Sequence, residues 1–257
     1  MITAGGTAEK IDDVRYIANS GTGRLGARIA EAFAADGRGC SILYICSENA
    51  ARPALDGAVC ETRVCGGIEA VRGAVMQACA ETAFDVIIHS MAIGDYRVRA
   101  VSDAELMTRG VLERLSVLAC GDSASPEEAV RGALLSPPQI NESKISSEKE
   151  NLVVVLEKAP KIIASLRGAA PGAVIVGFKL LSGADGEELA RAGHALLLKN
   201  DCDFVFANDI ETVRADRHEG LLIARDGTYE RAAGKEEIAA LITRRALERL
   251  PAEKRQT

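Results

Sequence analysis

The chain has 257 residues, of which 47% are apolar and 26% are charged, and it carries a formal net charge of −6. This is the composition of a globular protein, and the acidic balance argues against broad electrostatic binding to nucleic acid or to an anionic membrane. No apolar run approaches the roughly 18 residues that a membrane-spanning helix needs, and no basic and apolar leader is visible at the amino terminus.

The seven cysteines include no Cys-x-x-Cys pair, and their odd number argues against a disulfide framework. Most of them lie in apolar stretches, where a thiol behaves as a small hydrophobic side chain. We therefore expect buried, unreactive thiols in a protein of the cytoplasm.

Apolar runs of strand length alternate with stretches of helical periodicity, which predicts a parallel α/β sheet. Asp226-Gly227 between two short apolar runs also predicts a hairpin near the end of the chain. In chain order, the predicted elements are a strand at Met1–Thr3, a helix at Arg24–Asp36, a strand at Ser41–Cys46, a helix at Ile68–Glu81, strands at Phe84–His89 and Ala173–Phe178, a helix at Gly186–Leu198, a strand at Phe204–Ala207, hairpin strands at Leu221–Ala224 and Thr228–Arg231, and a helix at Lys235–Leu250.

The region 102–149 departs from this alternation. It holds two weak helical patches, Ala104–Leu118 and Pro126–Leu135, then a polar run, and it shows no strand signal. A long excursion of this kind is usually a functional flap or a disordered segment. We therefore predict one domain, 1–257, with a flap-like excursion around 102–149.

Two glycine-rich loops precede the first predicted helix. Ala4-Gly5-Gly6-Thr7 follows the first strand, and Gly21-Thr22-Gly23 with Gly26 leads into the helix. The second loop formally matches the dinucleotide fingerprint, but those glycines should follow their strand directly, and here residues 4–20 intervene. Free N–H groups at a helix N-terminus favour phosphate, so we predict phosphate binding; the alternative is that the glycines serve tight turns only. The predicted contacts are Gly5, Gly6, Thr7, Gly21, Thr22 and Gly23.

Four charged side chains elsewhere are further candidates. Asp95 lies just past the third predicted strand, where it could bind a metal ion or a ribose hydroxyl, or cap its loop. Lys144 stands among hydroxyl side chains and is either a phosphate clamp or a solvated lysine. Lys179 and Lys199 should share the sheet edge of the glycine loops if the strands are parallel, and would then complete a triphosphate site. The three histidines show no metal-binding spacing, so we expect them to be structural.

Several stretches, in order and over nearly the whole chain, resemble the phosphopantothenate–cysteine ligase (phosphopantothenoylcysteine synthetase) family. The opening block of glycines, arginine and asparagine is the most specific. The Phe178-Lys179-Leu180 form and the lack of a fused flavin decarboxylase domain are similar to the monofunctional branch. The matching stretches are Ile2–Asp12, Val14–Gly26, Met91–Arg97, Lys144–Ser147, Ala159–Ile163, Gly177–Leu180 and Lys199–Asp209.

The resemblance implies a fold, an activity and partners. With the order of the elements, it predicts a Rossmann-like three-layer α/β sandwich with a mostly parallel sheet and a late β-hairpin. It implies that 4′-phosphopantothenate is activated by CTP or ATP with Mg²⁺, and that the acyl-nucleotidylate is then attacked by L-cysteine in coenzyme A biosynthesis. Bacterial-type members use CTP, which we favour here, and members are usually homodimers; neither nucleic acid nor a membrane is an expected partner.

The resemblance also implies roles for single residues. It gives Asn19 a catalytic role on the acyl intermediate, Arg15 a role in supporting the same loop, and Lys144 a place on a flap that closes over the site. Such closure would exclude water from a hydrolysable intermediate. Asp95 could also contact the Mg²⁺ that accompanies a triphosphate. The remaining nucleotide contacts implied in this way are Met91, Asp95, Pro160, Phe178, Lys179 and Lys199.

Two departures from the family pattern bear on these roles. Some members carry a second phosphate-binding lysine one helical turn before Lys199, where this chain has Ala195, and Lys179 is the candidate to replace that charge. The stretch between Asp95 and Lys144 is longer than in bifunctional members, which leaves the path of the flap open.

Two rival functions remain at this stage. An NAD(P)-dependent reductase of the short-chain type would need a Tyr-x-x-x-Lys pair, and none of the four tyrosines has a lysine four residues later. A non-catalytic nucleotide-binding protein would bind nucleotide without turnover. Release of pyrophosphate that depends on both phosphopantothenate and cysteine would separate the ligase from both.

Overall fold

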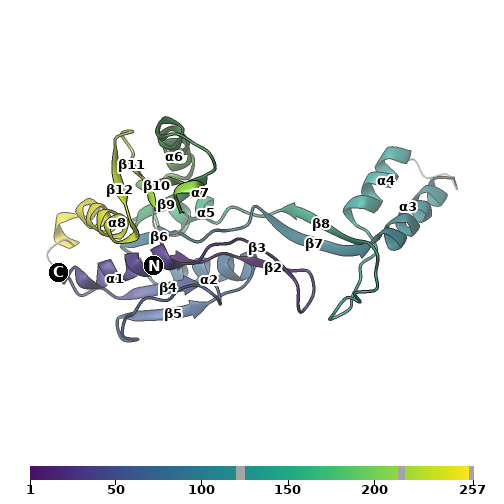
Figure 1. Cartoon of the computed structure of the whole chain (residues 1–257), viewed down its shortest axis with the longest axis horizontal. Coiled ribbons are helices and arrows are strands. Elements are labelled where there is room, and N and C mark those ends of the chain that lie inside the picture. The colour runs from purple at the N-terminus through teal and green to yellow at the C-terminus, as the bar shows by residue number, and fades with distance from the viewer. Residues whose placement is uncertain (120–124, 214–217, 255–257) are drawn as a thin grey trace. The chain divides into compact units, whose positions relative to one another are not determined.

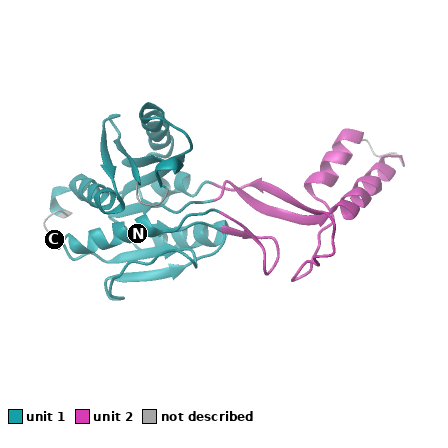
Figure 2. Ribbon diagram, in the orientation of Figure 1, with its two compact units in different colours: residues 1–7, 19–93, 161–257 teal, residues 8–18, 94–160 magenta. Residues whose placement is uncertain are grey.

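A computed structural model describes residues 1–119, 125–213 and 218–254 of the chain. The chain forms two compact units, which Figure 2 shows in different colours. Unit 1 comprises residues 1–7, 19–93 and 161–257, and unit 2 comprises residues 8–18 and 94–160. Each unit is therefore assembled from chain segments that are far apart in the sequence.

Unit 1 is built on an eight-stranded sheet with the order β12-β11-β10-β9-β6-β1-β4-β5. The strands from β5 to β10 in this order pair in parallel, and β11 and β12 add an antiparallel hairpin at one edge. The strands are β1 (Ile2–Ala4), β4 (Ile42–Cys46), β5 (Cys60–Val64), β6 (Val86–His89), β9 (Val174–Leu181), β10 (Phe204–Asp209), β11 (Glu219–Ala224) and β12 (Tyr229–Ala233).

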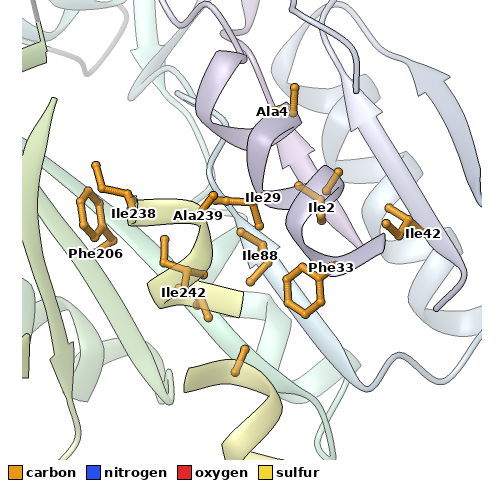
Figure 3. Close-up of a cluster of buried hydrophobic side chains, with 14 of the residues drawn as sticks. Ile2, Ala4, Ile29, Phe33, Ile42, Ile88, Phe206, Ile238, Ala239 and Ile242 are labelled. Carbon is orange, nitrogen blue, oxygen red and sulfur yellow. The ribbon is translucent and has the colours of Figure 1, made fainter. Parts of the chain in front are cut away.

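Helices cover both faces of this sheet, which makes three layers (Figure 1). On one face α1 packs beside α8, and their apolar side chains, among them Phe33 and Ile242, meet those of the strands in one buried cluster (Figure 3). On the other face α2, α5 and α6 bury a second cluster that includes Val71 and Leu166. The helices of unit 1 are α1 (Arg24–Ala35), α2 (Ile68–Glu81), α5 (Ile163–Ala169), α6 (Gly186–Asn200), α7 (Ile210–Val213) and α8 (Lys235–Arg249), followed by a 3₁₀ turn at Ala252–Lys254.

Because both faces are covered, the central strands are apolar throughout rather than alternating. In β4 all five residues are buried, and Tyr44 points to the α1 and α8 face while Ile45 points to the other. The predicted Rossmann-like three-layer α/β architecture with a late hairpin is confirmed.

Unit 2 contains two antiparallel ribbons and a pair of helices. Strands β2 (Ala8–Lys10) and β3 (Tyr16–Ala18) form one ribbon, and β7 (Tyr96–Asp103) and β8 (Leu152–Lys158) form the other. Helix α3 (Ala104–Ala119) contacts α4 (Pro126–Leu135), and α4 begins with a capping box between Ser125 and Glu128.

The excursion predicted at 102–149 lies inside unit 2. Its two helical patches are α3 and α4, at nearly the predicted bounds. The ribbon that carries them, β7 with β8, was not predicted, since charged residues such as Arg97 and Arg99 interrupt the apolar pattern of β7. The sequence pattern also does not predict strands β2, β3 and β5.

The prediction of buried thiols is confirmed for Cys46, Cys60 and Cys202, whereas Cys40, Cys65 and Cys79 are half-buried. Six are free, and burial raises their pKa values, that of Cys202 to about 11. Cys120 lies outside the described residues. Within the described ranges, no helix combines the length and the apolar character needed to cross a bilayer.

Arg167 joins α5 to the turn that precedes β10. Its guanidinium donates to the carbonyl oxygens of Pro171 (3.1 Å), Ala173 (2.8 Å) and Asp201 (3.0 Å), and to the carboxylate of Asp203 (2.7 Å). We predict that Arg167→Met lowers the free energy of unfolding by about 2–4 kcal/mol, because it leaves several polar groups in a partly buried site without a donor.

Urea denaturation measures this change. Arg191 is an exposed arginine on α6, and Arg191→Met should alter the free energy of unfolding by less than about 0.5 kcal/mol. Equal effects of the two substitutions would contradict the role of Arg167.

Candidate functional site

The two glycine-rich loops are in direct backbone contact at the edge of the sheet where β1 ends. A Cβ atom added to Gly6 would overlap the carbonyl oxygen of Asn19, and one added to Gly21 would overlap the carbonyl oxygen of Gly5. Gly23, the residue before α1, has φ +71°, in the left-handed region that favours glycine. These glycines therefore allow two chain segments to approach more closely than side chains would permit.

Neighbouring strand ends hold the first loop in place. The amide of Gly6 donates to Ser47 Oγ at 3.2 Å, after β4. The amide of Ala92, after β6, donates to the carbonyl of Gly5 at 2.8 Å, and that of Thr7 donates to the carbonyl of Ala92 at 3.1 Å. The predicted contacts Gly5, Gly6 and Thr7 thus lie where parallel strands end, the usual place for ligands in open α/β sheets.

The N-terminus of α1 is open to an anion. Gly23 provides no side-chain cap, and the first turn of α1 contains no acidic residue. By contrast, α2, α3, α4, α6 and α8 each have an acidic residue in the first turn. The unsatisfied N–H groups and the positive end of the helix dipole are therefore available for phosphate beside Gly21 and Thr22.

The first glycine loop positions Asn19. The Asn19 amide donates to the carbonyl of Thr7 at 3.0 Å, and its own carbonyl lies against Gly6. The residue is exposed, so its side-chain amide is accessible. Asn19 therefore presents a side-chain donor from a backbone that is fixed on both sides.

Phe178 and Lys179 lie near the end of β9 and point to opposite faces of the sheet. Phe178 packs against the cluster under α1 and α8, with its ring centroid 5.7 Å from that of Phe206. Lys179 shares the face of Gly177, whose neighbours include Ile163 of α5. Met91, just after β6, is buried in the cluster of that second face. A single ligand group therefore cannot contact Phe178 and Lys179 from the same side of the sheet.

The prediction that Lys199 lies at the same sheet edge as the glycine loops is wrong. Helix α6 runs from the end of β9 back to the start of β10, and Lys199 is in its last turn. It is therefore at the edge where β10 begins, whereas the glycine loops are at the edge where β1 ends. Lys199 precedes β10, and a residue that precedes a parallel strand lies at the opposite edge of the sheet from the residues that follow such strands.

In unit 2, a buried carboxylate joins two segments that are distant in the sequence. Asp12 accepts hydrogen bonds from the amides of Val14 (2.9 Å), Arg15 (2.7 Å) and Ile145 (3.1 Å). Arg15 Nη2 in turn donates to the carbonyl of Ile145 at 2.7 Å. Burial raises the pKa of Asp12, but the backbone donors and Arg15 outweigh it and hold the pKa below its ordinary value of 3.8. We call this arrangement the Asp12 clasp.

The clasp fixes the backbone on which Lys144 stands. Ser143 accepts from the amide of Asp13 at 2.9 Å, and Ile145 is fully buried, while the Lys144 side chain between them is exposed. Further along the segment, Lys149 pairs with Asp103 at 2.8 Å. The flap-like segment is therefore anchored within unit 2, and Lys144 is presented from it. Asp12 ends the stretch Ile2–Asp12 that resembles the family, but no local pattern predicts its contact with Ile145.

The other predicted residues of unit 2, Asp95 and Pro160, are exposed. The carbonyl of Asp95 accepts from the amide of Ala159 at 2.9 Å, so the two lie at the same end of the β7 and β8 ribbon. Among the described residues, no group of three or more His, Cys, Asp or Glu side chains could hold a metal ion.

Of the histidines, His89 and His218 are buried. His89 Nδ1 lies 3.0 Å from Thr3 Oγ1, and burial lowers its pKa to about 4, so a structural role fits. His218 differs, because its Nδ1 is buried and finds no hydrogen-bond partner in residues 1–119, 125–213 and 218–254.

Comparison with known proteins places this site in a family. The family model described as the DNA/pantothenate metabolism flavoprotein C-terminal domain matches residues 1–117 and 133–250. The intervening residues 118–132 cover the end of α3 and the start of α4 in unit 2. All the residues of the candidate site fall inside the match.

Curated relatives include the coenzyme A biosynthesis bifunctional proteins CoaBC of Thermococcus kodakarensis and Mycobacterium tuberculosis. The first is 26% identical over 227 residues, which are 88% of this chain and 45% of the relative. The second is 29% identical over 232 residues, 89% of this chain and 46% of the relative. The chain thus spans about half the length of the curated relatives it matches.

Two solved structures share the fold. The DNA/pantothenate metabolism flavoprotein from Streptococcus pneumoniae has a TM-score of 0.75 and 29% identity, and the match covers 95% of this chain and 96% of the other. A Cab2 variant in complex with phosphopantothenate-cysteine has a TM-score of 0.63 at 16% identity, with 96% and 86% covered, which supports the fold alone. Because the family match runs from the first strand to the last helix of unit 1, this chain belongs to the DNA/pantothenate metabolism flavoprotein C-terminal domain family.

Proposed function

We propose that this protein ligates 4′-phosphopantothenate to L-cysteine, with a nucleoside triphosphate as co-substrate, in coenzyme A biosynthesis. The observation that carries the proposal is the uncapped N-terminus of α1 beside two interlocked glycine loops, with Asn19 held between them. Membership of the family and the coenzyme A biosynthesis named for its CoaBC relatives support the same reaction.

The chemistry requires an activated acyl group, because a carboxylate is a poor electrophile. The carboxylate of phosphopantothenate attacks the α-phosphorus of the triphosphate, and pyrophosphate leaves. The amine of cysteine then attacks the acyl carbon, the nucleoside monophosphate departs, and the amine loses a proton. The α1 N-terminus and the backbone amides of residues 21–23 bind phosphate oxygens, and the side-chain amide of Asn19 donates to the oxyanion of the tetrahedral intermediate.

We propose CTP as the nucleotide, following the family resemblance. We propose Phe178 as a contact of its base, because the ring is half-buried near the end of β9 and is supported from below by the buried ring of Phe206. Lys179 contributes charge at the same edge of the sheet, and we leave Lys199 out of the nucleotide contacts because of its position. Mg²⁺ would neutralise phosphate charge. It commonly binds through one or two protein carboxylates plus the phosphates of the substrate. Asp95 is the carboxylate that we propose for this role. We also propose a homodimer, which sedimentation of the full chain would test.

The direct test is release of pyrophosphate by the full chain, with CTP, ATP, GTP and UTP in parallel. Release that requires both phosphopantothenate and cysteine is the expected result, fastest with CTP. Nucleotide binding without turnover would instead indicate a non-catalytic protein, and saturable NADPH binding would indicate the reductase.

Lys144→Gln is predicted to lower turnover by more than tenfold, about 1.4 kcal/mol in the barrier, with little change in Tm. The Lys144 side chain is exposed and its backbone is held by its neighbours, so removing the charge leaves the segment in place. Steady-state kinetics and thermal melting measure the two effects.

Lys149 provides the matched control in the same segment. Because it pairs with Asp103, Lys149→Gln should affect melting more than turnover. If Lys144→Gln lowers Tm and spares turnover, the catalytic role of Lys144 is wrong.

A further inference from the structure

Unit 1 contains a cavity of about 540 Å³ on the side of the sheet that carries α1 and α8. One face of α1, the loop after β4 and the start of α8 form its walls, and none of the loop glycines 5, 6, 21 and 23 is among its lining residues. The residues that line it and carry charge or an imidazole are Arg24, Arg28, Glu31, Arg52, His218, Lys235 and Glu236.

The charge of this lining is unbalanced. Both carboxylates are engaged by a single guanidinium, since Arg28 lies 2.7 Å from Glu31 and 3.3 Å from Glu236. Arg24, Arg52 and Lys235 form no ion pair with any residue that the structure describes. Three cations are therefore available to a ligand in the cavity.

His218 adds a neutral donor. It is only 7% exposed, and its Nε2 lies 3.2 Å from Asn208 Nδ2. Because the Asn208 amide nitrogen can only donate, Nε2 accepts and the ring proton is on Nδ1. That Nδ1 is buried and has no hydrogen-bond partner among the residues that the structure describes. Burial, together with the charge of Lys235, lowers the pKa of His218 to about 4, so the ring is neutral at pH 7.

A buried donor without an acceptor is rare in proteins, and it points to an acceptor supplied by a ligand. Phosphate offers several acceptor oxygens and up to two negative charges, which suits one N–H donor and a lining with three cations outside any ion pair. Gly234 is the N-cap residue of α8, and its amide donates to the carbonyl of His218 at 2.6 Å. The N-terminus of α8 therefore lies beside His218.

We propose that this cavity is a second anion-binding site, which takes a phosphate group through Lys235, Arg24 and the Nδ1–H of His218. It goes beyond the proposed ligase reaction, whose phosphates bind at the glycine loops.

The test is titration of the full chain, with ¹⁵N-labelled histidine, by inorganic phosphate at constant ionic strength, followed by NMR. We expect the His218 Nδ1 resonance to be that of a protonated nitrogen and to shift saturably. The resonances of His89 and His194, which do not line the cavity, should stay unchanged and report that the fold is intact. An equal response to chloride would overturn the proposal.

Two variants sharpen this test. Lys235→Ala should weaken phosphate binding by about tenfold, and Lys235→Arg should restore it. Arg191→Ala, on the opposite face of the sheet, should bind as the wild type does. The proposal is overturned if phosphate causes no saturable shift, or if Lys235→Ala binds it as tightly as the wild type.

Saturation with CTP distinguishes this cavity from the glycine loops. Phosphate should still shift His218 in the presence of CTP, and displacement would mean that the cavity is part of the nucleotide site rather than a second site. The ligase assay is independent of this result, because absence of turnover would refute the proposed function without affecting the binding of phosphate at His218.

Discussion

Asn19→Asp is expected to lower product formation by at least about 100-fold while nucleotide binding is preserved. In the proposed reaction the Asn19 amide donates to an oxyanion, and removal of one such donor typically costs about 2.7–4 kcal/mol in the barrier. At neutral pH aspartate can only accept, so it would also repel the developing negative charge. Because its backbone contacts to Thr7 and Gly6 do not involve the side chain, the loop should be retained.

Quenched-flow analysis should then detect the acyl-nucleotidylate, which forms before the step that needs the amide. Calorimetric titration with CTP measures the retained binding. Asn151→Asp makes the same change at an exposed position that precedes β8 and should have no effect. Product formation by Asn19→Asp at the wild-type rate would refute the assignment.

Gly6→Ala is expected to weaken CTP binding by roughly 100-fold, which corresponds to about 2.8 kcal/mol. The added methyl group would overlap the Asn19 carbonyl oxygen and would lie 3.0 Å from the amide nitrogen of Gly21. All of these neighbours are backbone atoms, so the two loops must separate. Loss of even two phosphate contacts at about 1.5–3 kcal/mol each accounts for the change.

Gly73 supplies the control, because a Cβ atom there meets nothing within 4 Å. Gly73→Ala, in the middle of α2, should leave CTP binding unchanged and stabilise the helix by up to about 1 kcal/mol. If Gly6→Ala binds CTP like the wild type, the glycine loops are simple turns and not a phosphate site.

Periodicity predicted those elements whose burial follows a regular pattern. Helix α2 has the predicted bounds because its buried residues Val71, Val75 and Ala78 recur at helical spacing. Strand β5 shows no such pattern, since most of its residues are exposed at the edge of the sheet. Strands β2 and β3 have three residues each, too few for a periodic signal.

Some residues of the candidate site are likewise predictable from local sequence, and others are not. Glycine loops before a helix predict a phosphate site by local chemistry alone, and the structure brings the two loops together. The edge at which Lys199 lies follows from its place before β10 rather than after it. The role of Asp12 follows from the hydrogen bond that its carboxylate accepts from the distant amide of Ile145. The spacing of residues along the chain predicts neither the edge of Lys199 nor the contact of Asp12, because both arise from packing between distant segments.

The Asp12 clasp has a consequence for the order in which the protein folds during synthesis. Arg15 and the carbonyl that it contacts are 130 positions apart in the chain. At about 5–20 residues per second, roughly 6–26 s pass between the synthesis of the two partners. During that interval the short β2 and β3 ribbon has no flap segment to bind, and a two-stranded ribbon alone is marginally stable in water. Unit 2 is therefore completed only after most of the chain has left the ribosome, and closing so long a loop slows its folding.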